Sequence, residues 1–405
     1  MKIFVHDYAG HPFQADLSRE LAARGHETTH LYFRGDQGPK GRLERSSEDP
    51  ICLNFIGVTL ARAYEKTSLV RRRFDDVAYG KRIAEHILSS RPELVISGNT
   101  PTEAQSSIIA ACKRTGALFV FWVQDFYSIA VTRLLQKKIG ILGYLVGGYY
   151  RFLERNQFRN SDAIVVITNA FADLAKRWSG TDTKVFTIEN WGAARDITPQ
   201  PKNNAWAQKH HLEHSFNFLY TGTLGFKHNP ELLVELAKEV VGRANVVVVS
   251  QGVGTTFLEN AKRQQGIDNL VLLPLQAFSD LALVLGTSDV ALATIEPDAG
   301  AFSVPSKVNA YFCAGRPVLL AAPFENLAAK TVHESGAGLV VHPADTVAFL
   351  KAAVSFLEND ELRTSAGRKA SEFAKANYDI KQVANRFEYV FRYATNVEKI
   401  RKEKQ

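Results

Sequence analysis

One segment of the sequence, Tyr220–Lys227 (YTGTLGFK), combines residue types that bind phosphate groups. Its glycines, Gly222 among them, let a backbone approach a ligand closely. Thr223 offers a hydroxyl, and Lys227 offers a point charge. A plain turn with a solvated lysine has the same composition, so this segment alone leaves both interpretations open.

A second candidate is the Gly-containing segment 296–309 (EPDAGAFSVPSKVN). We expect a helix to begin near Pro305, because proline suits the first helical turn. The backbone N–H groups of Ser306 and Lys307 would then be available to an anion such as a diphosphate. An ordinary loop with a normal helix cap is the alternative.

Two further candidates lie in the first half of the chain. Asp125 follows an apolar run and could serve as a base or hold a sugar hydroxyl, or it could simply cap a helix. The segment Asp7–Phe13 contains Gly10 and His11. His11 could contact an acceptor phosphate, or it could be an ordinary surface residue.

The elements that must position these residues are predicted from apolar periodicity. Continuous apolar runs indicate strands that are covered on both faces, as in parallel sheets, and helical patterns separate them. This alternation predicts a doubly wound α/β domain. The strands expected in the first half are Lys2–His6, Thr28–Tyr32, Glu93–Ser97, Ala117–Val123 and Ala163–Thr168.

A stretch rich in Pro, Asn and other polar residues, 188–215, is predicted to link two domains. The strand and helix alternation then restarts with a strand at Phe216–Tyr220, and we expect Thr221–Thr223 to form a turn. We therefore predict an acceptor-binding Rossmann-like domain over 1–195, a donor-binding one over 196–378, and a last helix, 379–405, that crosses back to the first domain. Ligands of such sheets bind beyond the carboxyl ends of the strands, so the sites are expected in a cleft between the domains.

The composition and net charge of the chain limit the classes of function that it can have. A net charge of +7 favours anionic partners, although it is also compatible with an ordinary solvated surface. The three cysteines are far apart in the sequence, which argues against a disulfide framework or a zinc site and favours a reducing cytoplasm. The longest apolar candidate, 139–148, is shorter than the roughly 20 residues that a bilayer requires. Most aromatic residues lie in apolar strands rather than on a basic platform, so we expect no nucleic acid partner.

The segments YTGTLGFKHNPELL and VALATIEPDAGAFSVPSKVNAYFCAGRPVLLA resemble the retaining GT-B glycosyltransferases of family 4 (group 1). Within that family, SVPSKV and CAGRPVL are similar to enzymes of bacterial capsule, colanic acid and O-antigen assembly, and to fucosaminyltransferases in particular. The resemblance covers nearly the whole chain and implies the GT-B fold, two Rossmann-like domains facing across a cleft.

The resemblance also implies roles for individual residues. It assigns Lys227 to the donor diphosphate and places the nucleotide base near Leu273–Phe278. The implied catalytic residues are Asp125, Glu296 and Lys227. The implied donor-binding residues are Gly222, Thr223, Lys227, Ser250, Gly252, Ser303, Val304, Pro305, Ser306 and Lys307, and the acceptor-binding residues are Gly10, His11, Asn99 and Tyr127.

Three departures from the family pattern concern the catalytic and donor-binding residues. The family has two glutamates eight positions apart, where this chain has Phe302 and Ala310; Glu296 could replace the first from a longer loop. Where the family has an arginine before the lysine that corresponds to Lys227, this chain has Thr223. Where the family has a histidine before the acidic residue that corresponds to Asp125, this chain has Gln124.

The implied reaction moves a sugar, with N-acetyl-L-fucosamine as a candidate, from a UDP-sugar to an undecaprenyl-diphosphate-linked saccharide, with retention and without a metal or other cofactor. A GT-B type UDP-sugar 2-epimerase and a transferase with a GDP-sugar donor are the alternatives. A Rossmann oxidoreductase is disfavoured because YAGHPF, not GxGxxG, follows the first strand.

Segment 133–159 mixes apolar and aromatic residues with arginines and lysines. Such a segment can lie at the interface of an anionic membrane, and the run Arg71-Arg72-Arg73 adds basic surface. Two amphipathic helices packed on the domain are the alternative. With the expected lipid-linked acceptor, this predicts peripheral association with the inner membrane.

Overall fold

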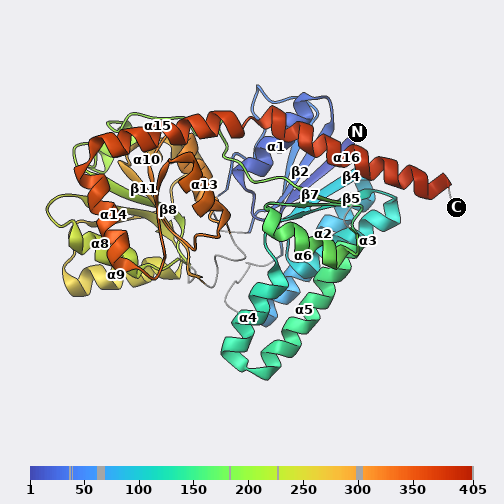
Figure 1. Cartoon of the computed structure of the whole chain (residues 1–405). Helices are drawn as coiled ribbons and strands as arrows, with labels where there is room; N and C mark the ends of the chain where they lie inside the picture. The colour runs from blue at the N-terminus through green and yellow to red at the C-terminus, as the bar shows by residue number, and fades with distance from the viewer. Residues whose placement is uncertain are drawn as a thin grey trace. The chain divides into compact units, whose positions relative to one another are not determined.

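The computed structural model describes residues 1–35, 38, 40–61, 69–181, 184–225, 228–297 and 304–403. The chain forms two compact units, one made of residues 1–189 and 380–405 and the other of residues 190–379 (Figure 1). Each unit is a parallel β-sheet covered by helices on both faces, so the predicted α/β class with two doubly wound domains is confirmed.

The first unit contains a seven-stranded sheet in the order β3-β2-β1-β4-β5-β6-β7, with every pairing parallel. Its central strands are fully buried, which explains their continuous apolar sequences. The strands are β1 (Lys2–Asp7), β2 (Glu27–Phe33), β3 (Leu53–Val58), β4 (Leu94–Gly98), β5 (Leu118–Val123), β6 (Ala163–Val166) and β7 (Val185–Thr187).

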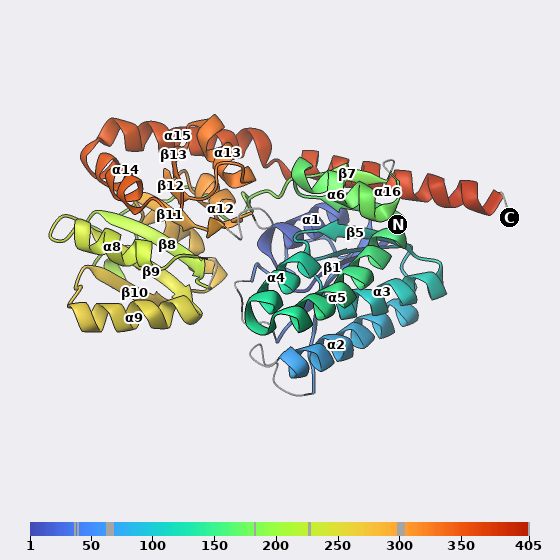
Figure 2. The same cartoon turned by 60° about the horizontal axis from the view of Figure 1, so that its bottom comes forward.

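Helices cover both faces of this sheet. Figure 2 shows α2, α3 and α5 side by side over one face, whereas α1 and α16 pack against each other on the opposite one. The helices are α1 (Pro12–Ala23), α2 (Leu69–Ser90), α3 (Thr102–Thr115), α4 (Tyr127–Ile139), α5 (Ile141–Arg159), α6 (Asn169–Ser179) and α16 (Ile380–Glu403).

The final helix, α16, belongs to the first unit, as the crossing-back helix predicted from the sequence requires. The ring of Phe387 lies 4.8 Å from that of Trp122 on β5, centroid to centroid. Glu388 accepts a hydrogen bond from Arg24 at 2.9 Å. The apolar stripe of α16 is thus buried against the sheet, which explains its 3.6-residue periodicity.

The second unit contains a six-stranded parallel sheet in the order β10-β9-β8-β11-β12-β13. The expected turn at Thr221–Thr223 is wrong, because β8 continues to Thr223 and pairs with β9 as far as Gln251. The strands are β8 (Asn217–Thr223), β9 (Asn245–Gln251), β10 (Leu270–Pro274), β11 (Val290–Thr294), β12 (Val318–Ala321) and β13 (Gly338–Val341).

The segment predicted as a linker, 188–215, is largely part of the second unit. The segment contains the short helix α7, and its side chains Ile197 and Trp206 are buried. The helices of this unit are α7 (Ala205–Lys209), α8 (Glu231–Glu239), α9 (Val253–Gln265), the 3-10 turn η1 (Phe278–Asp280), α10 (Leu281–Gly286), α12 (Lys307–Cys313), α13 (Leu327–Ser335), α14 (Thr346–Glu358) and α15 (Asp360–Asn377).

Candidate donor and acceptor sites

Each sheet has one point where the strand order reverses direction along the chain. In the first unit this point lies between β1 and β4, and in the second it lies between β8 and β11. The crevice beyond the carboxyl ends of such strands is where open α/β sheets bind ligands. Most of the residues singled out from the sequence follow these strands or their neighbours.

In the second unit, Gly222 lies near the end of β8 with φ +107°, a conformation that favours glycine. The hydroxyl of Ser250 on β9 donates a hydrogen bond to the carbonyl oxygen of Gly222 at 2.7 Å. Ser250 therefore holds the backbone of β8 in place, which is a positioning role. Gly252 (φ +117°) follows β9 and precedes α9, and a Cβ on it would lie 2.8 Å from the carbonyl oxygen of Leu224.

Lys307 brings a cation to the same edge of this sheet. Its Nζ lies 3.5 Å from the centroid of the Tyr220 ring on β8, in a cation–π contact. A Cβ on Gly222 would lie only 3.8 Å from this Nζ. The tyrosine ring thus directs the ammonium of Lys307 to the carboxyl end of β8, beside the segment expected to meet a diphosphate.

A second tyrosine fixes the base of this site. The hydroxyl of Tyr311 on α12 donates to the carbonyl oxygen of Leu292 at 2.9 Å and accepts from the amide of Thr221 at 3.3 Å. Burial raises the pKa of Tyr311, so its hydroxyl stays protonated. Tyr311 therefore ties α12, and with it Lys307, to the two strands at the reversal point.

The segment between β11 and α12 is described only in part. Glu296 is half-buried just beyond β11, and Val304, Pro305 and Ser306 precede α12. This helix begins at Lys307, two residues later than expected. The predicted site residues Lys227 and Ser303 lie outside the described residues.

In the first unit, the buried carboxylate of Asp7 organises the loop after β1. Asp7 accepts hydrogen bonds from the amides of Ala9 and His11, and its Oδ1 lies 3.1 Å from Nδ1 of His11. Burial alone would raise the pKa of Asp7, but the charge and hydrogen bonds of His11 outweigh it and lower that pKa. When Nδ1 of His11 donates to Asp7, its Nε2 is left as an acceptor for a ligand hydroxyl.

Two predicted acceptor residues, Gly10 and Asn99, lie beside this pair. Gly10 has φ +74°, and a Cβ on it would collide with Leu43 at 2.6 Å. Asn99 follows β4 in the left-handed region, with φ +55°, and its amide nitrogen lies 3.4 Å from Nδ1 of His11. The structure therefore brings Gly10, His11 and Asn99 together at one edge.

Gln14 is a polar group at this edge that we did not predict. It is fully buried in α1, and both its amide nitrogen and its amide oxygen lack hydrogen-bond partners among the described residues. A Cβ on Gly98 would lie 3.2 Å from both amide atoms. The sequence offers no signal for this, because a glutamine in the first turn of a helix is unremarkable on its own.

The loop after β5 carries Asp125 and Tyr127. Asp125 is exposed, and Tyr127 begins α4. Behind them, the buried carboxylate of Glu154 accepts hydrogen bonds from the amides of Tyr127 and Ser128 at 3.0 and 3.1 Å. Burial, aided by the nearby charge of Asp125, raises the pKa of Glu154 to about 7. Sequence reasoning missed this capping carboxyl because its partners lie far away along the chain.

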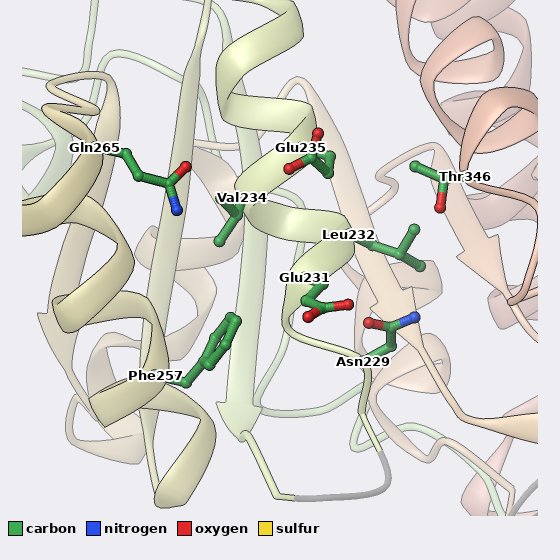
Figure 3. Close-up of a pocket in the computed structure, with 8 residues that line it drawn as sticks. All are labelled: Asn229, Glu231, Leu232, Val234, Glu235, Phe257, Gln265 and Thr346. Carbon is green, nitrogen blue, oxygen red and sulfur yellow. The ribbon is translucent and has the colours of Figure 1, made fainter.

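A pocket of about 340 Å³ lies elsewhere on the second unit, over α8 (Figure 3). Glu231 and Glu235 of α8 and Phe257 of α9 line it, and no lysine or arginine is among its described lining residues. Two carboxylates without a compensating cation disfavour an anionic ligand. This pocket is therefore a poor candidate for binding a diphosphate.

Comparison with known proteins finds similarity to glycosyltransferases. Residues 10–191 match the model of the glycosyl transferase 4-like domain. The chain is also 25% identical, over 284 residues, to the putative colanic acid biosynthesis glycosyl transferase WcaI of Escherichia coli K12, a match that covers 68% of each chain.

Solved glycosyltransferase structures share the architecture at low sequence identity. Sucrose-phosphate synthase from Thermosynechococcus elongatus superposes with a TM-score of 0.75 at 13% identity, covering 98% of this chain and 100% of its own. The Anabaena protein HepE in complex with UDP and glucose gives a TM-score of 0.72 at 13% identity, covering 96% and 99%. The chain has the GT-B fold, and its residues 10–191 are similar to the glycosyl transferase 4-like domain.

Proposed function

We propose that the chain is a retaining, metal-independent glycosyltransferase that moves a sugar from a UDP-sugar to an undecaprenyl-diphosphate-linked saccharide in bacterial O-antigen or exopolysaccharide synthesis. N-acetyl-L-fucosamine is the candidate sugar. The observation that carries the proposal is the cation of Lys307, held against Tyr220 beside Gly222 at the strand-order reversal of the second unit.

The donor chemistry is supported by the type of site. A diphosphate leaving group gains negative charge as the bond to the sugar breaks, and a fixed cation stabilises that charge. Lys307 supplies one cation, and the family resemblance assigns Lys227 to the donor diphosphate as well. Thr223, Ser306 and the amides around Ser303–Ser306 complete the proposed donor site. UDP as the nucleotide is supported by the structures of HepE, which hold UDP or UDP-glucose.

The acceptor chemistry is assigned to the first unit. His11, with its tautomer set by Asp7, and Asn99 offer hydrogen-bonding groups suited to sugar hydroxyls or to a phosphate. Tyr127, the first residue of α4, follows the loop after β5. We assign Asp125 to accept a hydrogen bond or a proton from a sugar hydroxyl, and Glu296 to replace the first glutamate of the family pattern.

The lipid-linked acceptor is supported by two observations. The E. coli relative is named for colanic acid biosynthesis, and the hairpin of α4 and α5 exposes apolar and basic residues. We accordingly place the protein in the bacterial cytoplasm, at the surface of the inner membrane.

Calorimetric titration of the purified chain with UDP, GDP and NAD, without added metal, tests the donor half of this proposal. We expect saturable binding of UDP and much weaker binding of the other two. Preferential GDP binding would reassign the donor nucleotide. Binding of NAD alone would contradict the transferase function.

A further inference from the structure

At the tip of the hairpin formed by α4 and α5, residues 141–149, the large apolar side chains are exposed and two glycines are buried. Ile141 is 80% exposed, Leu145 65% and Phe152 69%. Over residues 141–149 the only buried positions are Gly143 and Gly147. This is the reverse of the pattern of a helix pair that packs in water, where large apolar residues lie inside.

The two glycines explain how the helices hold together without those side chains. A Cβ on Gly143 would lie 2.3 Å from the carbonyl carbon of Leu135, and one on Gly147 would lie 2.2 Å from the hydroxyl of Thr132. The two glycines, in a GxxxG spacing, therefore let α5 pack closely on α4, Gly143 against its backbone and Gly147 against the Thr132 side chain. Small residues at such spacing are typical of helices that pack within an apolar solvent.

The base of the hairpin is fixed to the first unit, so the exposed tip projects from an anchored base. Gln157 donates a hydrogen bond to the carbonyl oxygen of Thr102 at 2.6 Å, and the ring of Phe158 stacks on that of Phe126 at 5.7 Å. Figures 1 and 2 show α4 and α5 side by side, and in Figure 1 their connected end extends beyond the sheet of this unit.

The charge of the hairpin is almost entirely positive. The only acidic residue in its two helices is Glu154, which is buried at the base. The arginines of the two helices are Arg133, Arg151, Arg155 and Arg159. A basic apolar projection of this kind complements an anionic phospholipid surface, whereas a second copy of the same basic hairpin would repel it.

The apolar tip is suited to shallow insertion into one leaflet, because Lys137 and Lys138 directly precede it in the sequence and long basic side chains can reach the lipid headgroups. Half of a bilayer core is about 15 Å thick, which corresponds to roughly ten helical residues. Exposed apolar residues extend from Ile139 to Phe152. Among the described residues, no helix is both long and apolar enough to cross a membrane.

We propose that the tip of the α4–α5 hairpin, residues 139–152, inserts into one leaflet of an anionic phospholipid bilayer. The inference deepens the membrane partner of the proposed function and rests on it only for the biological need to reach a lipid-linked acceptor. Insertion would hold the loop with Asp125 and Tyr127, which leads into α4, close to the membrane surface.

The test is co-sedimentation of the full chain with vesicles of phosphatidylethanolamine and phosphatidylglycerol, without nucleotide, and with phosphatidylcholine vesicles as the comparison. We expect binding to the anionic vesicles and at least a tenfold loss of affinity in the double variant Ile141→Glu/Leu145→Glu, because a charged side chain is strongly disfavoured in the hydrocarbon core. The matched control is Ile51→Glu, at an isoleucine of the same unit that is 88% exposed, and it should bind like the wild type.

A second measurement distinguishes insertion of the hairpin tip into a bilayer from its contact with another protein chain. Tryptophan at position 145, in the variant Leu145→Trp, should be quenched by lipids brominated in their acyl chains. Equal vesicle binding by the double variant, or a hairpin-dependent dimer without quenching, would overturn the inference. Calorimetry with UDP on the same samples keeps the two proposals apart, since vesicle binding without UDP binding would contradict the proposed function alone.

Discussion

At the scale of single residues, Lys307 carries the strongest prediction. Lys307→Met keeps an unbranched side chain that is one atom shorter and removes the charge from the edge beside Gly222. A hydrogen bond to a charged group contributes about 1.5–3 kcal/mol, so the dissociation constant for UDP should rise by about 10- to 100-fold. Calorimetry measures the change. Lys330→Met, at an exposed lysine of α13, is the matched control and should bind UDP normally.

Asp125 is predicted to act on turnover rather than on donor binding. It follows β5 in the first unit, whereas the donor groups lie on the second. Asp125→Asn should therefore lower kcat by about 100-fold or more and leave the dissociation constant for UDP within about twofold. Steady-state kinetics and calorimetry on the same preparation provide both numbers. Near-normal turnover would remove Asp125 from the catalytic residues.

The sequence predicted single residues well where neighbouring residues determine the conformation, and poorly where contacts between distant segments determine it. Gly10, Gly222 and Gly252 stood out in sequence, and each adopts a positive φ in a loop or at a strand end. The cation–π contact of Lys307 with Tyr220 could not be predicted, because only the fold brings together two residues that are 87 positions apart in the sequence. Gln14 carried no signal, since its burial depends on the packing of α1 against β4.

At the scale of elements, the base of the α4–α5 hairpin, where Glu154 accepts hydrogen bonds from the first amides of α4, should respond to pH. The pKa of Glu154 is raised from 4.5 to about 7, primarily because burial disfavours its charged form. The stability that this group contributes is fully present below pH 4.5 and is lost as the pH rises through about 7. Glutamine is neutral throughout, so Glu154→Gln should gain up to about 3 kcal/mol relative to the wild type between pH 5 and pH 8.

Denaturant unfolding at pH 5, 6, 7 and 8 measures this difference. Glu334→Gln, at an exposed glutamate of α13, is the control and should follow the wild-type curve. A constant difference between Glu154→Gln and the wild type at all four pH values would contradict the raised pKa of Glu154.

The elements themselves were predicted well where burial alone determines the pattern. The strands at β1, β4, β5 and β6 have continuous apolar sequences because helices cover both faces of the sheet. The turn expected at Thr221–Thr223 failed because pairing with β9 outweighs the local preference of Gly222 for a turn. The short helix α7 was missed because five residues among prolines and asparagines show too little periodicity.

At the scale of the whole molecule, α16 returns the end of the chain to the first unit. Phe387 is fully buried and packs its ring on Trp122. Phe387→Ala should therefore destabilise this unit by about 3–5 kcal/mol through the cavity it creates. Unfolding followed by tryptophan fluorescence measures the loss. Tyr389→Ala on the same helix, at a residue that is 59% exposed, should lose about 1 kcal/mol or less, and equal losses would contradict the docking of α16.

The central claim concerns the whole molecule, since transfer requires a donor and an acceptor together. The most direct measurement is the release of UDP from a panel of UDP-sugars, UDP-N-acetyl-L-fucosamine among them, with and without a lipid extract of bacterial membranes. The sugar is radiolabelled and its entry into the organic phase is followed.

We predict that UDP release and lipid labelling both depend on the extract, and that Lys307→Met lowers them together. A free or epimerised sugar formed without the extract would support a UDP-sugar epimerase instead. No turnover of any UDP-sugar, by a preparation that sediments as a folded protein, would contradict the account.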